Sequence, residues 1–167
     1  HRPPPVIRLP GVARIRGVTY VNDSKSTTPD SLLFALRQAR GPVVVILGGR
    51  DKGLDFKPLA LALHQDRIRG IVLIGESRER LRLVLGASET LREASTLEAA
   101  IHEAATLAHP GDTVLFSPAC ASFDMFRDFE ARGRAFKAIV QRLQHGGSNG
   151  QANGYAPRAS KAPAGHA

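Results

Sequence analysis

The sequence predicts an α/β domain in which helices cover both faces of a mostly parallel sheet. Short apolar runs, several of them rich in β-branched residues, alternate along the chain with longer segments of helical periodicity. Two of these runs, 42–47 and 70–75, are apolar throughout, which is typical of strands that are buried on both faces. Strands that alternate with helices in this way are usually joined as parallel neighbours by helical crossovers.

The first elements are expected between residues 17 and 36. Residues 1–16 are rich in Pro and Arg, and we interpret them as a leading segment from a preceding domain. The chain does not open with Met, which we interpret as a sign that it was cut from a longer protein. A strand is predicted at 17–21, a polar loop at 22–29 and a helix from Asp30, since Pro29 suits a first helical turn.

The remaining elements follow the same alternation. They are a strand at 42–47, a loop at 50–56, a helix at 58–64, a strand at 70–75, helices at 77–85 and 96–108, a strand at 113–116, a loop at 117–122 and a final helix at 124–143. From residue 145 the chain is rich in Gly, Asn, Pro and Ala and has too little apolar surface to order itself. The predicted organisation is therefore a leading segment (1–16), a folded domain (17–144) and a flexible tail (145–167).

Composition argues against several classes of protein. The net charge of +8 would suit a nucleic-acid partner, but the arginines are scattered and aromatic residues make up only 5%, so stacking platforms for bases are scarce. No apolar run approaches the roughly 20 residues that span a membrane. The single cysteine, Cys120, excludes an internal disulfide, fits a reducing cytoplasm and lies among small residues, so we expect it to be packed rather than reactive. We expect neither a nucleic-acid nor a membrane partner.

Three loops that follow predicted strands carry groups suited to an anionic ligand. The loops are 22–29, 48–55 and 117–124, and the carboxyl ends of parallel strands meet at one edge of a sheet. Their side chains that suit carboxylates or phosphates are Lys25, Thr27, Lys52 and Ser122. Helices begin soon after two of these loops, and helix N-termini favour anions. Together these features predict a site for a small anion.

Each of these residues also has a simpler interpretation. Thr27 or Thr28 could cap a helix, Ser122 could cap the final helix, and the lysines could be solvated. Their occurrence together at consecutive strand ends favours a site. The sequence contains no Walker-type phosphate loop, dinucleotide fingerprint, zinc-type Cys/His spacing or nucleophile elbow. It therefore predicts binding without the machinery that activates a nucleotide.

The same three loops carry a family resemblance. The segments are Asn22-Asp23-Ser24-Lys25-Ser26-Thr27, then Leu47 to Phe56, then Ser117 to Asp124 with Phe126 and Phe129. In order and spacing they resemble three segments of the Mur ligases, and the resemblance covers roughly residues 8–143. The Asp-Ser-Lys run is most similar to the branch of that family that adds D-glutamate to UDP-N-acetylmuramoyl-L-alanine.

The resemblance implies a fold and a function. The chain would be the last of three domains, a Rossmann-like three-layer α/β domain that acts in the cytoplasm in peptidoglycan precursor synthesis, within a monomeric enzyme. A central domain, absent here, would hold ATP and Mg²⁺. The ligase would convert the alanyl carboxylate to an acyl phosphate, and the amine of D-glutamate would attack it. This chain would supply the glutamate site, close over ATP and be inactive by itself.

Roles for individual residues follow from the resemblance alone. Thr27 and Lys52 would hold one carboxylate of glutamate, and Ser122 with the backbone N–H of Phe129 would hold the other. Two fixed carboxylates orient the amine for attack. The general base is left unassigned.

A second set of residues would face the nucleotide. Asp23 and Lys25 would reach it when the domain closes, and Lys25 would act catalytically by offsetting charge on the phosphates. An Arg that contacts ATP falls on Arg8 or, with an insertion, on Arg2. Arg50 stands where some family members have an acidic residue.

Three alternatives remain open at this level. One is a glutamate-adding domain like that of folylpolyglutamate synthases, against which the Ser-Pro-Ala-Cys-Ala-Ser run argues. Another is a basic module that binds nucleic acid or nucleotide phosphates. The last is an interaction domain without a small ligand. The choice between D- and L-glutamate also stays open.

Overall fold

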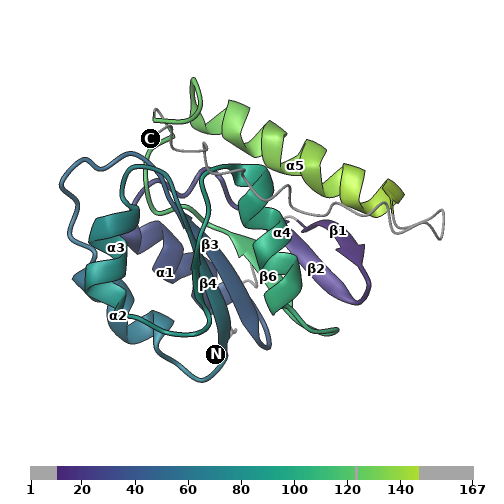
Figure 1. Cartoon of the computed structure of the whole chain (residues 1–167), viewed down its shortest axis with the longest axis horizontal. Coiled ribbons are helices and arrows are strands. Elements are labelled where there is room, and N and C mark those ends of the chain that lie inside the picture. Colours follow the sequence, from purple (N-terminus) through teal and green to yellow (C-terminus); the bar gives the residue numbers. More distant parts are fainter. Residues whose placement is uncertain (1–10, 123, 147–167) are drawn as a thin grey trace, which may run out of the picture.

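A mixed sheet lies between two layers of helices (Figure 1). The computed structural model describes residues 11–122 and 124–146. Within them the strand order is β1-β2-β6-β3-β4-β5, and every neighbouring pair is parallel except β1 with β2. The strands are β1 (Gly11–Ile15), β2 (Val18–Asn22), β3 (Val43–Gly48), β4 (Ile68–Ile74), β5 (Leu91–Glu93) and β6 (Thr113–Phe116). The helices are α1 (Pro29–Gln38), α2 (Lys57–Leu63), α3 (Arg78–Leu85), α4 (Leu97–Leu107) and α5 (Phe129–Gly146). The predicted α/β fold is confirmed.

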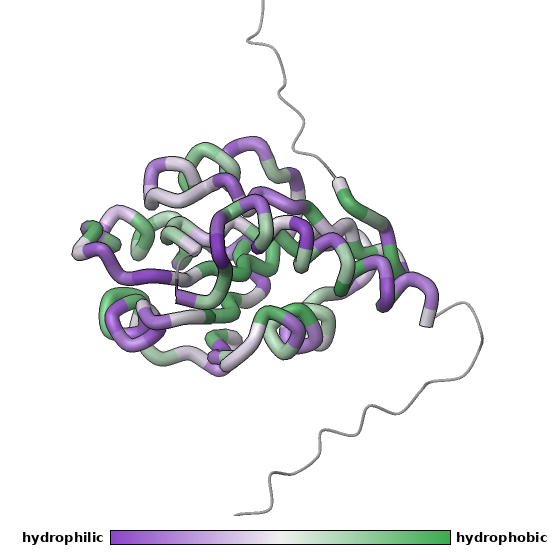
Figure 2. Tube along the Cα trace, turned by 90° about the horizontal axis from the view of Figure 1, so that it is seen from above, coloured by the Kyte–Doolittle hydropathy of each residue, from purple (hydrophilic) through white to green (hydrophobic). Residues whose placement is uncertain are grey.

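The central strand β3 shows how the two layers are built. Successive side chains of a strand point to opposite faces. Val43, Val45 and Leu47 pack in the cluster that contains the buried residues of α1, α2 and α3. Val44 and Ile46 pack in the cluster that contains those of α4 and α5. Hydrophobic segments accordingly gather in the middle of the molecule and hydrophilic ones at its outer turns (Figure 2).

Side-chain caps mark where two helices begin. Thr28 accepts a hydrogen bond from the N–H of Ser31 at 3.3 Å, and Pro29 occupies the first turn of α1. Thr96 caps α4 in the same way, through the N–H of Ala99 at 3.0 Å. Such caps satisfy N–H groups that the first helical turn leaves without an acceptor. The simpler interpretation of the Thr27–Thr28 pair is thus confirmed for Thr28.

The last helix begins five residues later than predicted. The carbonyl of Ser122 accepts from the N–H groups of Met125 and Phe126, at 3.0 and 2.8 Å, which closes a tight turn in front of the helix. Asp128 is the residue that caps α5, since its Oδ1 accepts from the N–H of Ala131 at 2.7 Å. The interpretation of Ser122 as the cap of this helix was therefore wrong.

Two strands were not predicted. β1 lies in the stretch interpreted as a leading segment and pairs with β2 through a turn in which Arg16 and Gly17 have φ of 51° and 78°. Its partly exposed edge position explains why its sequence lacks an apolar run. β5 has only 3 residues, fewer than a periodic pattern needs. Arg2 and Arg8 lie outside the described residues, as do residues 147–167 of the predicted tail, while 145 and 146 end α5.

Across residues 11–122 and 124–146, no helix combines the length and the apolar character that crossing a membrane would require.

Candidate functional site

Three parallel strands end at the same height in the middle of the sheet. Phe116 of β6 is paired with Asn22 of β2 on one side and with Ile46 of β3 on the other. The loops 22–29, 48–55 and 117–122 therefore start together at the carboxyl edge (Figure 1). The prediction that these loops converge is confirmed.

Backbone hydrogen bonds join the three loops directly. The third loop lies between the other two, because β6 lies between β2 and β3. It donates from the N–H of Ala119 to the carbonyl of Ser26 at 2.9 Å. It accepts from the N–H of Arg50 at the carbonyl of Ala121, at 2.8 Å, in an isolated antiparallel bridge. The loops that carry Thr27, Lys52 and Ser122 thus form one connected surface.

The predicted substrate residues differ in exposure. Lys52 is exposed, Thr27 is half-buried and Ser122 is only 2% exposed. Phe129 is the first residue of α5, where a helix leaves the N–H without an intrahelical acceptor, and its ring is 42% exposed. Its carbonyl accepts from the hydroxyl of Ser24 at 2.7 Å, so the start of α5 is attached to the first loop.

Asp23 lies inside the site rather than on its surface. Its side chain is 2% exposed, and its Oδ2 accepts from the hydroxyls of Ser26 and Ser117, the latter at 2.8 Å. The carboxylate therefore ties the first loop to the third. Its contact with a nucleotide remains a prediction.

Lys25 points toward solvent beside the start of α5. It is exposed and lines an open groove of about 380 Å³ together with Phe129, Arg134 and Lys137 of that helix. The cationic side chains in this groove suit phosphate oxygens better than any neutral ligand.

The loop that bears Lys52 is held by α3. Asp51 accepts from the N–H of Gly53 at 2.9 Å and forms an ion pair with Arg80. Arg80 also donates to the carbonyl of Leu54 at 2.8 Å, and its guanidinium lies 4.8 Å from the centre of the Phe56 ring. The sequence analysis assigned no role to Arg80, so it missed this contact.

Ser77 and Cys120 fill the space beneath the second loop. The hydroxyl of Ser77 accepts from the N–H of Gly49 at 3.1 Å and lies 3.5 Å from the sulfur of Cys120. Burial raises the pKa of the Cys120 thiol to about 11, against a smaller opposing effect of the Ser77 hydrogen bond. The thiol is therefore protonated at neutral pH, and its interpretation as a packed residue is confirmed.

The buried residue Arg132 was missed by sequence reasoning. It is 1% exposed, and its guanidinium donates to Ser24 and to the carbonyl of Cys120. Burial lowers its pKa to about 10, which leaves it charged at neutral pH. A sequence signal existed, because Arg132 is four residues before Phe136 on the apolar face of α5.

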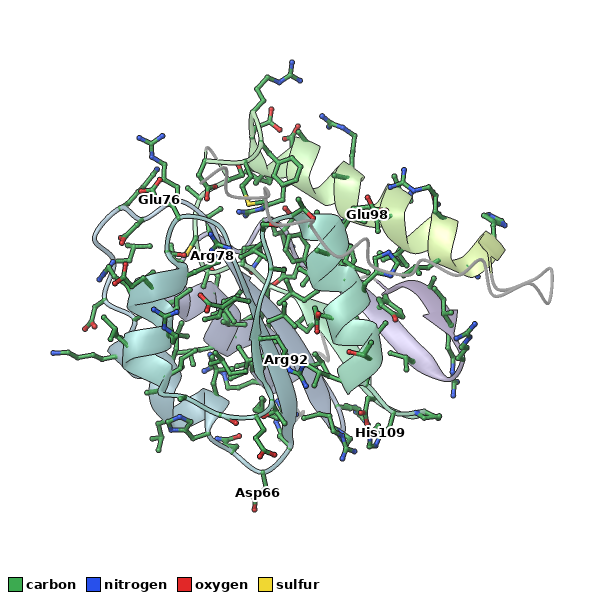
Figure 3. The ribbon with its side chains drawn as sticks, in the orientation of Figure 1. Asp66, Glu76, Arg78, Arg92, Glu98 and His109 are labelled. Atoms are coloured by element: carbon green, nitrogen blue, oxygen red, sulfur yellow. The ribbon has the colours of Figure 1, made fainter. Side chains whose placement is uncertain are left out.

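Asp124 links the site to the end of β4. Its Oδ2 accepts from the N–H of Glu76 at 2.9 Å, while its Oδ1 is buried and, in the part of the chain that the structure describes, has no hydrogen-bond partner. Figure 3 places Glu76 at the site edge, at the end of the molecule opposite Asp66 and His109.

The chemistry that this arrangement offers is binding and orientation. It presents ammonium, hydroxyl and backbone N–H groups at one edge, and these bind carboxylates and phosphates. Over residues 11–122 and 124–146, no group of three or more His, Cys, Asp or Glu side chains is placed to hold a metal ion.

The chain matches a known protein family. Residues 8–120 match the model of the family described as Mur ligase, glutamate ligase domain.

Curated relatives are similar over most of this chain. It is 47% identical over 139 residues to a UDP-N-acetylmuramoylalanine–D-glutamate ligase of Geobacter metallireducens, which covers 83% of this chain and 30% of that protein. It is 44% identical over 133 residues to the ligase of the same name from Chlorobium phaeobacteroides, which covers 80% and 28%. The chain thus spans under a third of the length of these relatives.

Solved structures share the fold at lower identity. A domain from Haemophilus ducreyi, assigned to a UDP-N-acetylmuramate:L-alanyl-gamma-D-glutamyl-meso-diaminopimelate ligase, has a TM-score of 0.53 at 19% identity. It covers 83% of this chain and 98% of that domain.

Proposed function

The chain belongs to the Mur ligase family, whose glutamate ligase domain it matches, and we propose that it binds the glutamate substrate of a ligase that adds D-glutamate to UDP-N-acetylmuramoyl-L-alanine. The observation that carries the proposal is the joining of three loops, which bear Thr27, Lys52 and Ser122, at the carboxyl edge of one sheet. The names of the relatives support the substrate, and the reaction would serve peptidoglycan precursor synthesis in the cytoplasm.

The proposed binding mode uses both carboxylates of glutamate. Thr27 and the ammonium of Lys52 hold one, and the hydroxyl of Ser122 with the N–H of Phe129 holds the other. Hydrogen bonds to an ionised group are about twice as strong as neutral ones, so four donors suffice to fix a small dicarboxylate. The amine is then the one reactive group left without an anchor. Fixing its position makes the attack effectively unimolecular. This can lower the barrier by at most roughly 7–11 kcal/mol.

ATP and Mg²⁺ are proposed to bind mainly to a preceding domain. When bound, ATP supplies the phosphoryl group that activates the alanyl carboxylate. The groove beside α5 fits phosphate oxygens, because Lys25, Arg134 and Lys137 line it. Lys25 would reach the phosphates and offset their charge, as would Arg8, which lies outside the described residues. The carboxylate of Asp23 holds the loop that carries Lys25, through the hydroxyls of Ser26 and Ser117. We also propose that Asp23 contacts the nucleotide directly when the domain closes.

Titration of the chain with amino acids tests the proposed function. D-glutamate should shift backbone amide resonances of the three loops and of Phe129, and it should raise the melting temperature, since a ligand that binds only the folded state stabilises it. L-glutamate and D-alanine are the controls for stereochemistry and for the second carboxylate. Saturating D-glutamate without any resonance shift would refute the proposed site.

Activity measurements test the division of labour between domains. The isolated chain should hydrolyse no ATP and form no amide bond, because it contains no phosphate loop. ATP turnover by the purified chain, abolished by a substitution within it, would contradict the assignment.

A further inference from the structure

We propose that Arg132 is a positioning residue for the glutamate site, because its buried guanidinium holds the first loop, the third loop and the start of α5 in one fixed arrangement. The inference rests on the proposed function. It adds that the spacing between the two carboxylate anchors is set by a residue that touches neither carboxylate.

The guanidinium uses its planar fork to join two loops. Its Nε donates to the hydroxyl of Ser24 at 3.0 Å, and its Nη2 donates to the carbonyl of the same residue at 2.7 Å. Its Nη1 donates to the carbonyl of Cys120 at 2.9 Å. Bidentate attachment fixes the orientation of Ser24 as well as its position.

Ser24 extends this connection to the start of α5. Its hydroxyl accepts from Arg132 and donates to the carbonyl of Phe129 at 2.7 Å. Arg132 itself belongs to α5, so the path from Arg132 through Ser24 to Phe129 closes on one helix. Rotation of the first helical turn relative to the first loop would break at least two of these hydrogen bonds.

Each contact lies next to a proposed anchor. Ser24 is three residues before Thr27, Cys120 is two residues before Ser122, and Phe129 is itself an anchor. The second loop is included by packing, because a Cβ added at Gly49 would lie 3.3 Å from Nη1 of Arg132. A single cation is therefore hydrogen-bonded to the first and third loops and leaves no room for a side chain at Gly49 of the second.

Stability alone would not call for a charge at this position. The hydrogen bonds of Arg132 go to neutral oxygens, and a buried charge carries a large desolvation cost that well-packed apolar residues avoid. That cost is offset by charge-assisted bonds and by the Phe116 ring, whose centre lies 5.9 Å from the guanidinium carbon. An apolar side chain could fill the volume, but it would leave the loops unconnected.

The test is the kinetics of Arg132→Lys in the full-length ligase. Lysine keeps the charge but cannot bond Ser24 and Cys120 with a planar fork. The Michaelis constant for D-glutamate should rise by about tenfold or more, because the anchors of its carboxylates are misplaced. The Michaelis constant for ATP should stay within about twofold, because ATP is proposed to bind mainly to a preceding domain.

Arg69→Lys is the matched control. Arg69 donates to both carboxylate oxygens of the buried Asp112, at 3.0 and 3.3 Å, at the amino edge of the sheet. This edge is where Figure 3 shows His109, whose N–H also donates to Asp112. Arg69→Lys should lower the melting temperature less than Arg132→Lys does, because the Arg69 side chain is 38% exposed. It should leave the Michaelis constant for D-glutamate within about twofold, because the lost bidentate contact is remote from the site.

The outcomes separate the inference from the function on which it rests. If the wild-type enzyme fails to use D-glutamate, the proposed function is wrong. If the wild type uses it and Arg132→Lys leaves its Michaelis constant unchanged, or if both lysine variants raise it equally, the positioning role is wrong. Should Arg132→Lys not fold, Ser24→Ala removes only the hydroxyl between Arg132 and Phe129. It should raise the same constant by about fivefold or more, because two hydrogen bonds are lost, and no rise would overturn the proposal.

Discussion

Replacement of Gly48 by alanine should push the start of the second loop away from strand β4 and destabilise the chain. Gly48 ends β3 with φ of 122°, a conformation that only glycine adopts easily. An added Cβ would lie 2.0 Å from the carbonyl oxygen and 2.9 Å from the carbonyl carbon of Ile74 on the neighbouring strand β4. Because side chains essentially never approach backbone closer than 3.0 Å, the ends of β3 and β4 have to separate by roughly 1 Å.

The expected cost combines two terms. Alanine at this φ costs about 1–3 kcal/mol. Loss of roughly two hydrogen bonds at the strand ends, at about 1 kcal/mol each, brings the total to about 3–5 kcal/mol. Gly53→Ala is the matched control, because Gly53 lies in the same loop at φ of 74° with nothing within 4 Å of the added Cβ. It should cost about 1–2 kcal/mol, the strain of one left-handed residue.

Urea unfolding at neutral pH, followed by circular dichroism, measures both variants. Gly48→Ala should lower the free energy of unfolding by about 1–4 kcal/mol more than Gly53→Ala does, and its melting temperature should fall by roughly 10 °C. Equal costs for the two variants would refute the contact between the loop and β4 as the reason for glycine at position 48.

Three further predictions concern single residues. Lys52→Ala in the full-length ligase should raise the Michaelis constant for D-glutamate about tenfold or more, whereas Lys57→Ala, an exposed lysine in α2, should not, and equal effects would exclude a specific role for Lys52. Cys120 should resist iodoacetamide in the native chain at pH 8 and react in denaturant, because burial raises its pKa to about 11, and mass spectrometry that found rapid native labelling would contradict its burial. Burial raises the pKa of Asp112, but hydrogen bonds from Arg69 and the N–H of His109 outweigh it, so the pKa is lowered in the folded state. The stabilisation by Asp112 is present above its unfolded pKa of about 3.9 and is lost as pH falls through the folded value. The free energy of unfolding of Asp112→Asn should therefore depend less on pH below about 4 than that of the wild type. An unchanged dependence would exclude the ion pair as its source.

The layers of the fold were predictable because strands that are buried on both faces consist of apolar residues throughout. Residues 43–48 are buried at every position, and a strand with that pattern has to be covered on both faces. β1 was not predictable in the same way. It is an edge strand with exposed and half-buried positions, and its turn uses Arg16 where asparagine or aspartate would have been a clear signal.

The convergence of the loops followed from topology, but their connections did not. Parallel strands with consecutive crossovers place their carboxyl ends at one edge, so Thr27, Lys52 and Ser122 could be assigned to one region. The partners of Arg132 lie 108 and 12 residues away in sequence, and no local pattern specifies such contacts. A charged residue on the apolar face of α5 was the only trace of the network.

The first loop shows why its motif cannot be divided into ligands and spacers. Asp23, Ser24 and Ser26 are buried and hydrogen-bonded, whereas Lys25 is exposed and Thr27 is half-buried. The buried members hold the backbone against the third loop and α5, and only a backbone held in this way can present the alternate side chains outward. Substitution of a buried member should therefore change ligand binding as much as substitution of an exposed one. Apparent affinity alone would not distinguish substitutions of buried and exposed members. The stability of the unliganded chain would distinguish them, because substitution of a buried residue should lower it and substitution of Lys25 should not.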